Sequence, residues 1–282
     1  MTFKHPEKWR ETCDPFSLHY HQFRPVEILG YPHARNDVFH VRGLHQGREV
    51  TAYIKASRHT DSATARDAAI LAQLDGPVYP KVLDTGDVPV PFSVTEALPG
   101  ARLSVILGAN EDMASLAYME EYGAALARLH QLTPDAPPQS DRRFYHRPPK
   151  NMLDALSLAH LDAYFDHPPQ TAETVFCHGD LHYANLLWAD GHISAILDFE
   201  LSGYGNRDFD IAWAMFLRPG QRFMQTTEEQ QLFLQGYGKH RECNADAVRY
   251  YMAQCYVYFL HFNDDAPEYC QYIRAWLADN CG

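Results

Sequence analysis

The 282-residue sequence lacks long apolar runs and paired cysteine motifs. No stretch reaches the roughly eighteen consecutive apolar residues of a membrane span, and residues 1–16 lack the apolar core of a signal peptide. The six cysteines include no CxxC pair, which argues against a structural zinc site and against a disulfide framework. We therefore expect a protein that is not exported, works in the cytoplasm and keeps its thiols reduced.

Basic residues are scarce compared with acidic ones. The chain has 24 Lys and Arg against 36 Asp and Glu, which gives a formal net charge of −12. This balance disfavours nucleic acid and anionic membranes as partners, and it would help to attract a cationic ligand. Solubility alone would explain the same balance. The sequence contains no internal repeat and leaves the oligomeric state open.

The first hundred residues have the pattern of a small sheet. Residues 25–57 alternate apolar and polar side chains around turn-rich breaks at 30–37 and 43–47, which is typical of three antiparallel strands. Residues 81–100 predict two more short strands, the second over 92–97. We expect these strands to form one antiparallel sheet.

Helical patterns account for most of the rest. Residues 62–74 carry an apolar stripe that begins after a helix cap at Asp61 or Ser62. A longer helical period covers 113–132, and further helices are expected at 209–217, 228–237, 245–262 and 270–277. Residues 133–151 are rich in proline and have no periodicity, which predicts a long surface loop, either functional or mobile.

The stretch 175–212 contains the residues that could take part in catalysis or metal binding. Its two short apolar runs, 185–189 and 193–197, flank Asp190-Gly191 and predict a hairpin. If Asn185 begins the first strand and Asp198 ends the second, both side chains lie at the open end of the hairpin. Asp180 is five residues upstream of Asn185, so two carboxylates and an amide oxygen can converge. Hard oxygen ligands of this kind suit Mg²⁺ that is also held by phosphates.

His178-Gly179-Asp180, Asn185 and Asp198 together resemble the HGDxxxxN and IDxD/E signature of aminoglycoside phosphotransferases and choline kinases. The resemblance implies a two-lobed α+β fold like that of protein kinases. It divides the chain into a nucleotide-binding lobe, 1–97, and a helical catalytic and substrate-binding lobe, 98–282. It also implies a small-molecule kinase that moves the γ-phosphate of ATP or GTP to a hydroxyl group.

The resemblance also implies roles for the individual motif residues. Asp180 would orient the acceptor hydroxyl and take its proton, while Asn185 and Asp198 would hold Mg²⁺ against the phosphates. His178 and Asp210 would support the catalytic loop as structural residues.

The first lobe offers matching positions for a nucleotide. Lys55 would hold the α- and β-phosphates, with Asp67 as its partner in place of the usual glutamate. The phosphate-covering loop keeps Gly30 but lacks repeated glycines, so backbone N–H groups over 33–37 would contact phosphate. Asn36 could adopt a left-handed backbone there.

The hinge and the acceptor site are the least specific parts of the resemblance. Backbone groups near Glu96 and Leu98 would bind the base, which leaves no sequence code for ATP or GTP. Candidates for binding ammonium groups of an acceptor are Glu200, Asp264, Asp265 and Glu268, although the last three also suit a solvated loop. An aminoglycoside or similar cationic antibiotic is the first choice, with choline, ethanolamine, homoserine or a sugar as alternatives. Antibiotic resistance and metabolism both stay open.

Two other interpretations compete with the kinase. His178, Asp180, His182 and Asp198 could form a metallohydrolase cluster, but this leaves Lys55 unexplained, and the remaining histidines show no ligand spacing. A kinase-like binding module without catalysis is the other, and the complete set of motif residues argues against it.

Overall fold

The computed structural model describes residues 13–32, 35–60, 62–170, 173–263 and 265–281. The chain divides into two compact units. The first comprises the residues up to Gly100 together with Ser194–Ser202, and the second comprises Ala101–Ile193 and the residues from Gly203 onward. The sequence analysis placed the boundary between a nucleotide-binding lobe and a catalytic lobe at residue 97. These functions of the two lobes stay a prediction. Among the described helices, none combines the length and the apolar character that crossing a bilayer requires.

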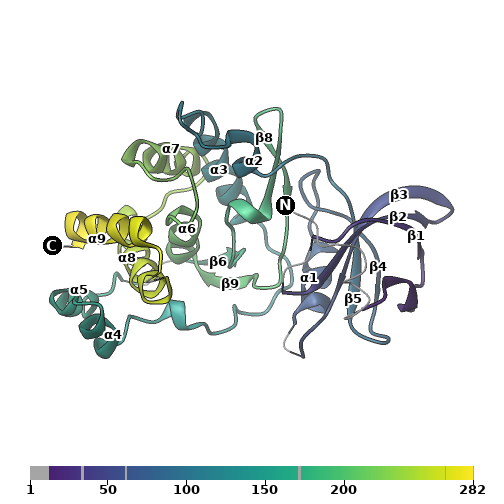
Figure 1. The fold of residues 1–282 in the computed structure, drawn as a ribbon, viewed down its shortest axis with the longest axis horizontal. Helices are drawn as coiled ribbons and strands as arrows, with labels where there is room; N and C mark the ends of the chain where they lie inside the picture. Colours follow the sequence, from purple (N-terminus) through teal and green to yellow (C-terminus); the bar gives the residue numbers. More distant parts are fainter. Residues whose placement is uncertain (1–12, 33–34, 61, 171–172, 264, 282) are drawn as a thin grey trace. The chain divides into compact units, whose positions relative to one another are not determined.

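The first unit is built on the predicted antiparallel sheet (Figure 1). The strand order is β1-β2-β3-β5-β4. Alternate residues of the central strands point inward, and Phe39, Val41 and Ile54 are fully buried. All five predicted strands are present: β1 Phe23–Gly30, β2 Asp37–His45, β3 Arg48–Ala56, β4 Val82–Gly86 and β5 Phe92–Glu96.

Tight turns with left-handed residues set the register of two hairpins. Gln46 and Gly47, between β2 and β3, have φ of 51° and 79°, as a type I′ turn requires. Asp190 and Gly191 have φ of 52° and 80° and join β7 (Leu186–Ala189) to β8 (His192–Ile196). The predicted hairpin at Asp190-Gly191 is confirmed.

Helix α1, Thr64–Leu71, packs against β4 and β5, as Figure 1 shows. The helix was predicted, but its predicted cap is wrong. Ala63 is the N-cap and makes no side-chain cap hydrogen bond. The Ser62 hydroxyl instead donates a 2.7 Å hydrogen bond to Oδ1 of Asn36, and Asp61 lies outside the described residues. The Ser62 side chain therefore binds Asn36 rather than capping α1.

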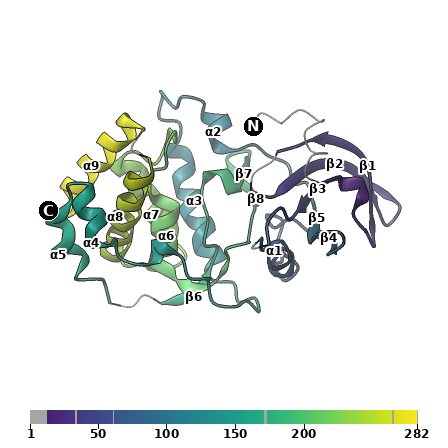
Figure 2. The same ribbon diagram turned by 60° about the horizontal axis from the view of Figure 1, so that its bottom comes forward.

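The second unit is mainly helical (Figure 2). Helix α3 packs against α7 and α6 packs against α8, and the apolar faces of these helices form its core. The predicted helices correspond to α3 Leu116–Leu129, α6 Arg207–Met215, α7 Thr227–Gly238, α8 Ala245–Phe262 and α9 Pro267–Cys281. The sequence did not predict the short elements α2 Leu103–Leu107, α4 Lys150–Ala155, α5 Asp162–Phe165, β6 Thr174–Cys177 and β9 Gly203–Asn206.

Local backbone geometry explains two boundary differences. Asn110 and Met113 have φ of 56° and 55°, which a helix cannot include, so α3 begins at Leu116 rather than at 113. Residues 133–151 are irregular as predicted, except for a 3-10 turn over Arg143–Tyr145 and the start of α4. Several side chains of this segment are half-buried, so it packs against the unit rather than extending freely.

Candidate active site

The HGD sequence lies in a loop whose backbone is held by helix α6. This loop follows the buried strand β6, which ends at Cys177. The Asp210 carboxylate accepts hydrogen bonds from the amides of His178 at 3.0 Å and Gly179 at 2.9 Å. Gly179 has φ of 80°, a conformation that favours glycine. The Asp180 amide donates to Nδ1 of His178 at 3.3 Å. These contacts agree with structural roles for His178 and Asp210.

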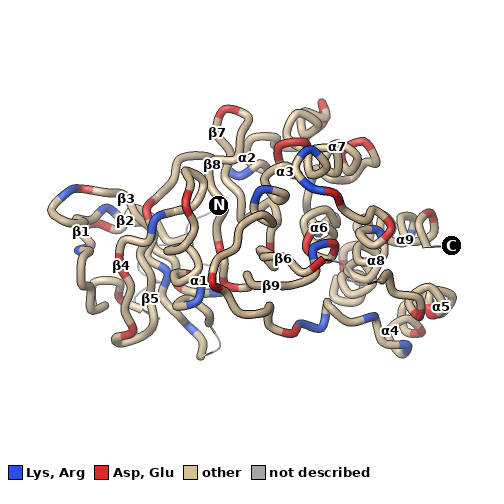
Figure 3. The backbone as a smooth tube through the Cα atoms, turned by 180° about the vertical axis from the view of Figure 1, so that it is seen from behind, with Lys and Arg blue, Asp and Glu red and all other residues tan. Residues whose placement is uncertain are grey.

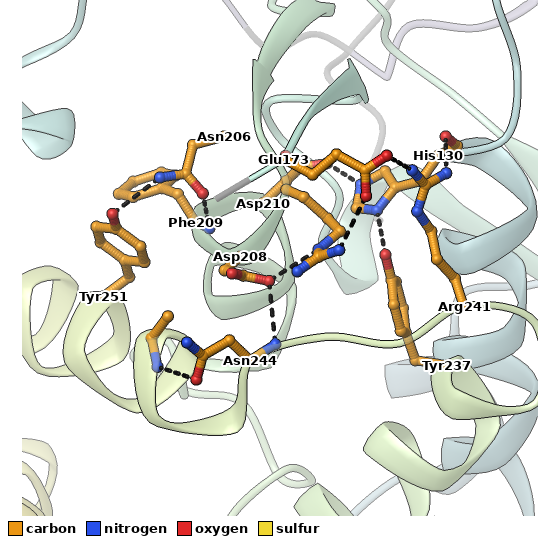
Figure 4. A network of polar contacts seen from close by, with 12 residues as sticks. His130, Glu173, Asn206, Asp208, Phe209, Asp210, Tyr237, Arg241, Asn244 and Tyr251 are labelled. Atoms are coloured by element: carbon orange, nitrogen blue, oxygen red, sulfur yellow. Dashed lines mark hydrogen bonds and ion pairs between the residues drawn. The ribbon is translucent and has the colours of Figure 1, made fainter. Parts of the chain in front are cut away.

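A buried polar network holds Asp210 itself (Figure 4). Nε2 of His130 lies 3.1 Å from the Asp210 carboxylate, and Nδ1 lies 2.8 Å from the Tyr237 hydroxyl. A proton on Nε2 suits this pair, because a carboxylate can only accept a hydrogen bond. Arg241 donates to the His130 carbonyl at 2.9 Å and also pairs with Glu173. Asp210, which holds the loop, is therefore itself held through His130 by α3 and α7.

Asn206 fixes the start of α6 within the same region (Figure 4). Its side-chain oxygen accepts from the Phe209 amide at 3.1 Å, which is a side-chain N-cap. Its amide group donates to the Tyr251 hydroxyl at 2.8 Å. The helix that carries Asp210 is thus capped and tied to α8.

The Asp180 carboxylate is surrounded by donors and positive charge. The Trp213 indole donates to Oδ1 at 2.8 Å, and Nε2 of His182 lies 3.6 Å from Oδ2. Burial on its own would raise the pKa of this carboxyl. His182, the buried guanidinium of Arg218 and the Trp213 N–H together lower the pKa to about 2. Asp180 is therefore a carboxylate at neutral pH.

Asn185 is joined to the same loop. It ends a 3-10 turn over Tyr183–Asn185 and directly precedes β7. Its amide group donates a 3.0 Å hydrogen bond to the Asp180 carbonyl. This bond uses the N–H and leaves the side-chain oxygen to accept or to coordinate.

In the first unit, Lys55 gathers three carboxylates. Its Nζ lies 2.8 Å from Asp67, 2.8 Å from Asp198 and 3.1 Å from Glu200. The predicted Lys55–Asp67 ion pair is confirmed. Burial on its own would lower the pKa of Lys55, but the three carboxylates together raise it. Lys55 therefore stays charged, and the cluster keeps an excess of negative charge.

Each carboxylate of this cluster has a distinct environment. Asp67 is buried, and its second oxygen accepts from the Phe199 amide at 2.7 Å. Asp198 has φ of 68° and a side chain that is 43% exposed, so it presents a carboxylate oxygen to solvent. Burial raises the pKa of Glu200, with Asp198 and Asp67 adding to this effect and Lys55 opposing it.

The predicted phosphate-covering loop is linked to this cluster. Gly30 ends β1 and pairs with His40 of β2, and residues 33 and 34 lie outside the described residues. Asn36 is buried, and its amide group donates to Glu200 at 2.5 Å. Asn36 is not among the described residues with positive φ, so the left-handed backbone expected there is not observed.

The predicted hinge leaves one backbone donor available. The Glu96 amide donates to the Lys81 carbonyl at 2.9 Å, and the Glu96 carboxylate accepts from the Lys81 amide at 3.2 Å. No hydrogen bond within the described part of the chain engages the Leu98 amide. Contact of Leu98 with a nucleotide base stays a prediction.

The acidic residues expected to bind the acceptor have different local surroundings. Asp265 and Glu268 are exposed at the start of α9, while Asp264 lies outside the described residues. Glu200 is half-buried and is held by Lys55 and Asn36. Its contacts favour a role beside Lys55, and its predicted acceptor role stays untested.

One buried group could in principle hold a metal ion. Among the described residues, only the side chains of His130, Cys177 and Asp210 bring three possible ligand atoms close together. Asp210 already binds two amides and His130, and burial raises the pKa of the Cys177 thiol. These residues are better explained as loop support than as metal ligands.

The family follows from a comparison of the sequence with family models. The model of the phosphotransferase enzyme family matches residues 28–243, which is more than half of the chain. The chain belongs to this family. It is therefore a small-molecule phosphotransferase that acts on a hydroxyl group, and its family decides against the metallohydrolase interpretation. Among curated proteins, no sequence matches that of this phosphotransferase.

Solved structures show that the phosphotransferase has a kinase-like fold. An amicoumacin kinase, hAmiN, in complex with AMP-PNP, Ca²⁺ and Ami has a TM-score of 0.61 at 14% identity, covering 98% of this chain and 97% of its own. The aminoglycoside phosphotransferase APH(4)-Ia has a TM-score of 0.61 at 14% identity and 94% coverage of each chain. Plasmodium vivax ethanolamine kinase has a TM-score of 0.56 at 12% identity, covering 93% of this chain and 81% of its own.

The sequence analysis missed several neighbours of the motif residues in this phosphotransferase. Trp213 contacts Asp180, and Arg142 donates to the Gly179 carbonyl at 2.7 Å. The one available signal was the spacing of Trp213 three residues after Asp210, which places both on one helix face. Arg142 had no such signal, because its segment has no periodicity.

Proposed function

We propose that the protein transfers the γ-phosphate of ATP or GTP to the hydroxyl of a small molecule, with Asp180 as the catalytic base. The contacts of Asp180 carry this proposal. One carboxylate oxygen is fixed by Trp213, while His182, at 3.6 Å, is the one side chain among the described residues that pairs with the other. That second oxygen can accept the hydrogen of an acceptor hydroxyl, which orients the oxygen nucleophile.

The low pKa of Asp180 suits this reaction. A carboxyl with a pKa of about 2 is ionised at neutral pH, so it can accept a hydrogen bond but is a weak base. Phosphoryl transfer passes through a loose transition state in which the nucleophile is little bonded, so positioning matters more than early proton removal. Asp180 would therefore orient the hydroxyl first and take its proton late.

The first unit would hold the phosphates. Lys55 is charged and held by Asp67, and its amino group would bind the phosphate oxygens when nucleotide replaces its other partners. Amicoumacin kinase hAmiN, a protein of the same fold, was solved with AMP-PNP and Ca²⁺, which supports a nucleotide as co-substrate. Gly30, Asn36, Glu96 and Leu98 are assigned to the same nucleotide site.

The oxygen ligands that Asn185 and Asp198 could supply suit Mg²⁺. One carboxylate oxygen of Asp198 pairs with Lys55, which leaves the other to coordinate an ion. The side chain of Asn185 uses its N–H in a hydrogen bond, which leaves its oxygen to coordinate. A carboxylate oxygen and an amide oxygen are ligands that Mg²⁺ prefers. The ion, when bound, would neutralise phosphate charge, while Asn185 and Asp198 orient it.

The acceptor is proposed to be an aminoglycoside or a similar cationic antibiotic. The net charge of −12 and the exposed carboxylates of Asp265 and Glu268 support a cationic acceptor. Structures of the same fold include an antibiotic kinase and an ethanolamine kinase, so choline, ethanolamine, homoserine and sugars belong in the same test. A cytoplasmic location is part of this proposal.

Acceptor-dependent release of ADP or GDP, with Mg²⁺ and either nucleotide, tests the function against this panel. We expect one acceptor class to respond, and Asp180→Asn to lower kcat by at least about 100-fold, because misplacing the acceptor hydroxyl costs that much. Asp198→Ala should also lose activity. Asp190→Asn is the matched control, since this exposed turn residue should leave turnover unchanged. Unchanged turnover in Asp180→Asn would overturn the proposal.

A further inference from the structure

The two oxygens of the Asp180 carboxylate have different partners, and one of them is fixed by helix α6. The indole of Trp213 donates to Oδ1 at 2.8 Å. Trp213 is buried and lies three residues after Asp210 on α6, so both side chains leave the same helix face. One face of α6 therefore holds the backbone of the catalytic loop through Asp210 and its carboxylate through Trp213.

Arg142 reaches the same loop from the segment 133–151. Its guanidinium donates to the Gly179 carbonyl at 2.7 Å and lies 4.6 Å from the centroid of the Trp213 ring. The planar guanidinium suits this double task, because it can donate in its plane while it stacks on an aromatic face. Arg142 thus contacts both the peptide that precedes Asp180 and the ring that binds its side chain.

We propose that Arg142 and Trp213 are positioning residues for Asp180. Arg142 fixes the Gly179–Asp180 peptide and the plane of the indole, and the indole N–H holds Oδ1 so that Oδ2 is the oxygen that takes the acceptor hydroxyl. The inference rests on the proposed function, in which Asp180 is the base. It also gives the segment 133–151 a role as a supporting part of the catalytic loop.

The neighbouring Arg143 provides a matched control. It is exposed, and its guanidinium lies over the rings of Phe262 at 5.0 Å and Phe144 at 5.7 Å. No hydrogen bond to the catalytic loop is found for Arg143 among the described residues. Both guanidinium groups lie over aromatic rings, but only Arg142 is joined to the catalytic loop, so positioning predicts an effect on the Trp213 indole and on kcat for Arg142→Met and none for Arg143→Met.

The first test reads the Trp213 indole by ¹⁵N NMR of the full chain and needs no acceptor. The four tryptophans give four indole signals, and Trp213→Phe identifies the signal of Trp213. We expect this signal to move in Asp180→Asn, which removes the charged acceptor, and in Arg142→Met. It should stay in place in Arg143→Met. If the chemical shift of the Trp213 indole is the same in Asp180→Asn as in the wild type, the proposal is overturned.

The second test is kinetic and uses the acceptor to which the wild-type protein responds. We expect Trp213→Phe and Arg142→Met to lower kcat about tenfold or more, as displaced catalytic groups do, with an unchanged KM for nucleotide. In Trp213→Phe, loss of the N–H donor raises the pKa of Asp180, so the acid limb of kcat should lie at a higher pH than in the wild type. Arg142→Lys should recover little, because lysine lacks the planar fork.

The outcomes separate the two proposals. If Asp180→Asn is inactive while Trp213→Phe and Arg142→Met match the wild type in kcat and pH profile, the positioning role is wrong and the proposed function stands. If Asp180→Asn keeps full turnover, the proposed function itself is wrong. Should Trp213→Phe fail to fold, as thermal unfolding would show, the kcat of Arg142→Met against that of Arg143→Met carries the test alone.

Discussion

Asp198 occupies a backbone conformation that few residues other than glycine adopt. Its φ of 68° lies in the left-handed region, where an L-residue costs roughly 1 kcal/mol relative to glycine. The same conformation turns its carboxylate toward Lys55 and leaves it 43% exposed. Strain of this kind persists at functional sites, where the geometry it produces is needed.

Asp198→Gly should therefore stabilise the protein and abolish phosphate transfer. Glycine relieves the strained backbone, which should raise the free energy of unfolding by about 1 kcal/mol, while the loss of the carboxylate removes a proposed metal ligand. Urea unfolding without nucleotide measures the stability. Asp198→Ala is the control, because it loses the carboxylate but keeps the strain. Equal stability of the two variants would show that the strain is negligible.

Glu200 should lower stability at neutral pH because its folded pKa is raised, mainly by burial. An acid with a raised folded pKa stabilises the fold below its unfolded pKa of about 4.3, and that contribution is lost as pH rises through the folded pKa. Glu200→Gln should thus be more stable than the wild type at pH 7, and this advantage should vanish below about pH 4.

Thermal unfolding across this pH range measures the effect of Glu200→Gln. Glu49→Gln is the control in the same unit, since its side chain is 68% exposed and its charge costs little. An advantage of Glu200→Gln that persists unchanged at low pH would contradict the assigned cause, because a neutral glutamic acid and glutamine carry the same charge.

At the scale of elements, the second unit depends on the close approach of α3 and α7. A Cβ added at Gly236 would lie 1.8 Å from the Glu120 carbonyl oxygen, and one at Gly123 would lie 1.9 Å from the Phe233 carbonyl oxygen. Both overlaps are with backbone, which cannot move away as a flexible side chain can. The two glycines therefore set the distance between these helices.

Gly236→Ala should destabilise the protein by roughly 3 kcal/mol, at the upper end of overpacking costs. Gly238→Ala, two residues away on α7, has nothing within 4 Å of the added Cβ and should be neutral or more stable by up to about 1 kcal/mol. Chemical denaturation of both variants decides the point. Similar stabilities for the two variants would mean that α3 and α7 separate without cost.

The elements that the sequence predicted are those with a strong period or a strong turn. The hairpin around Asp190-Gly191 and helix α8 repeat their patterns over enough residues to be read locally. Strand β9, with the sequence GYGN, has little intrinsic strand preference and forms by pairing with β6, which is distant in sequence. Such pairing depends on tertiary structure and has no local signal.

The candidate site divides in the same way. Asp180 and Asn185 could be proposed from the sequence because phosphoryl transfer needs those residue types at a fixed spacing, and Lys55 because it needs a lysine on the third strand; their roles stay predictions. Trp213 and Arg142 were not, because a tryptophan on an apolar helix face and an arginine in a loop have common structural explanations. Likewise, the link from Asn36 to Glu200 joins segments far apart in the sequence.

At the scale of the whole chain, the net charge does not by itself mark an acceptor site. Figure 3 shows acidic and basic positions interspersed along both units, although acidic residues outnumber basic ones by 36 to 24. A mixed distribution of charged positions favours solubility, and it focuses the field on a cation less than a block of acidic residues would. The choice of acceptor therefore depends on local contacts.

The first unit is completed by a segment that is distant in sequence. Phe199 is fully buried and packs on Tyr79, its amide donates to Asp67, and the Ile196 amide donates to the Val78 carbonyl at 2.9 Å. Ser194 donates to the Pro99 carbonyl at 2.6 Å, so the two ends of the unit lie close together. A fragment that stops at residue 97 lacks all of these contacts.

A fragment of residues 1–97 should therefore not unfold cooperatively, whereas residues 1–100 joined to 194–202 by a short Gly/Ser linker should. Without Phe199, the core beside Tyr79 is exposed and the buried Asp67 carboxylate loses its amide donor, each of which costs several kcal/mol in a domain of this size. Calorimetry of the two fragments measures the difference, and Phe199→Ala in the linked fragment serves as the control. Cooperative unfolding of residues 1–97 at the same temperature as the linked fragment would show that the strands and α1 are sufficient on their own. The predicted lobe boundary at residue 97 would then hold for folding.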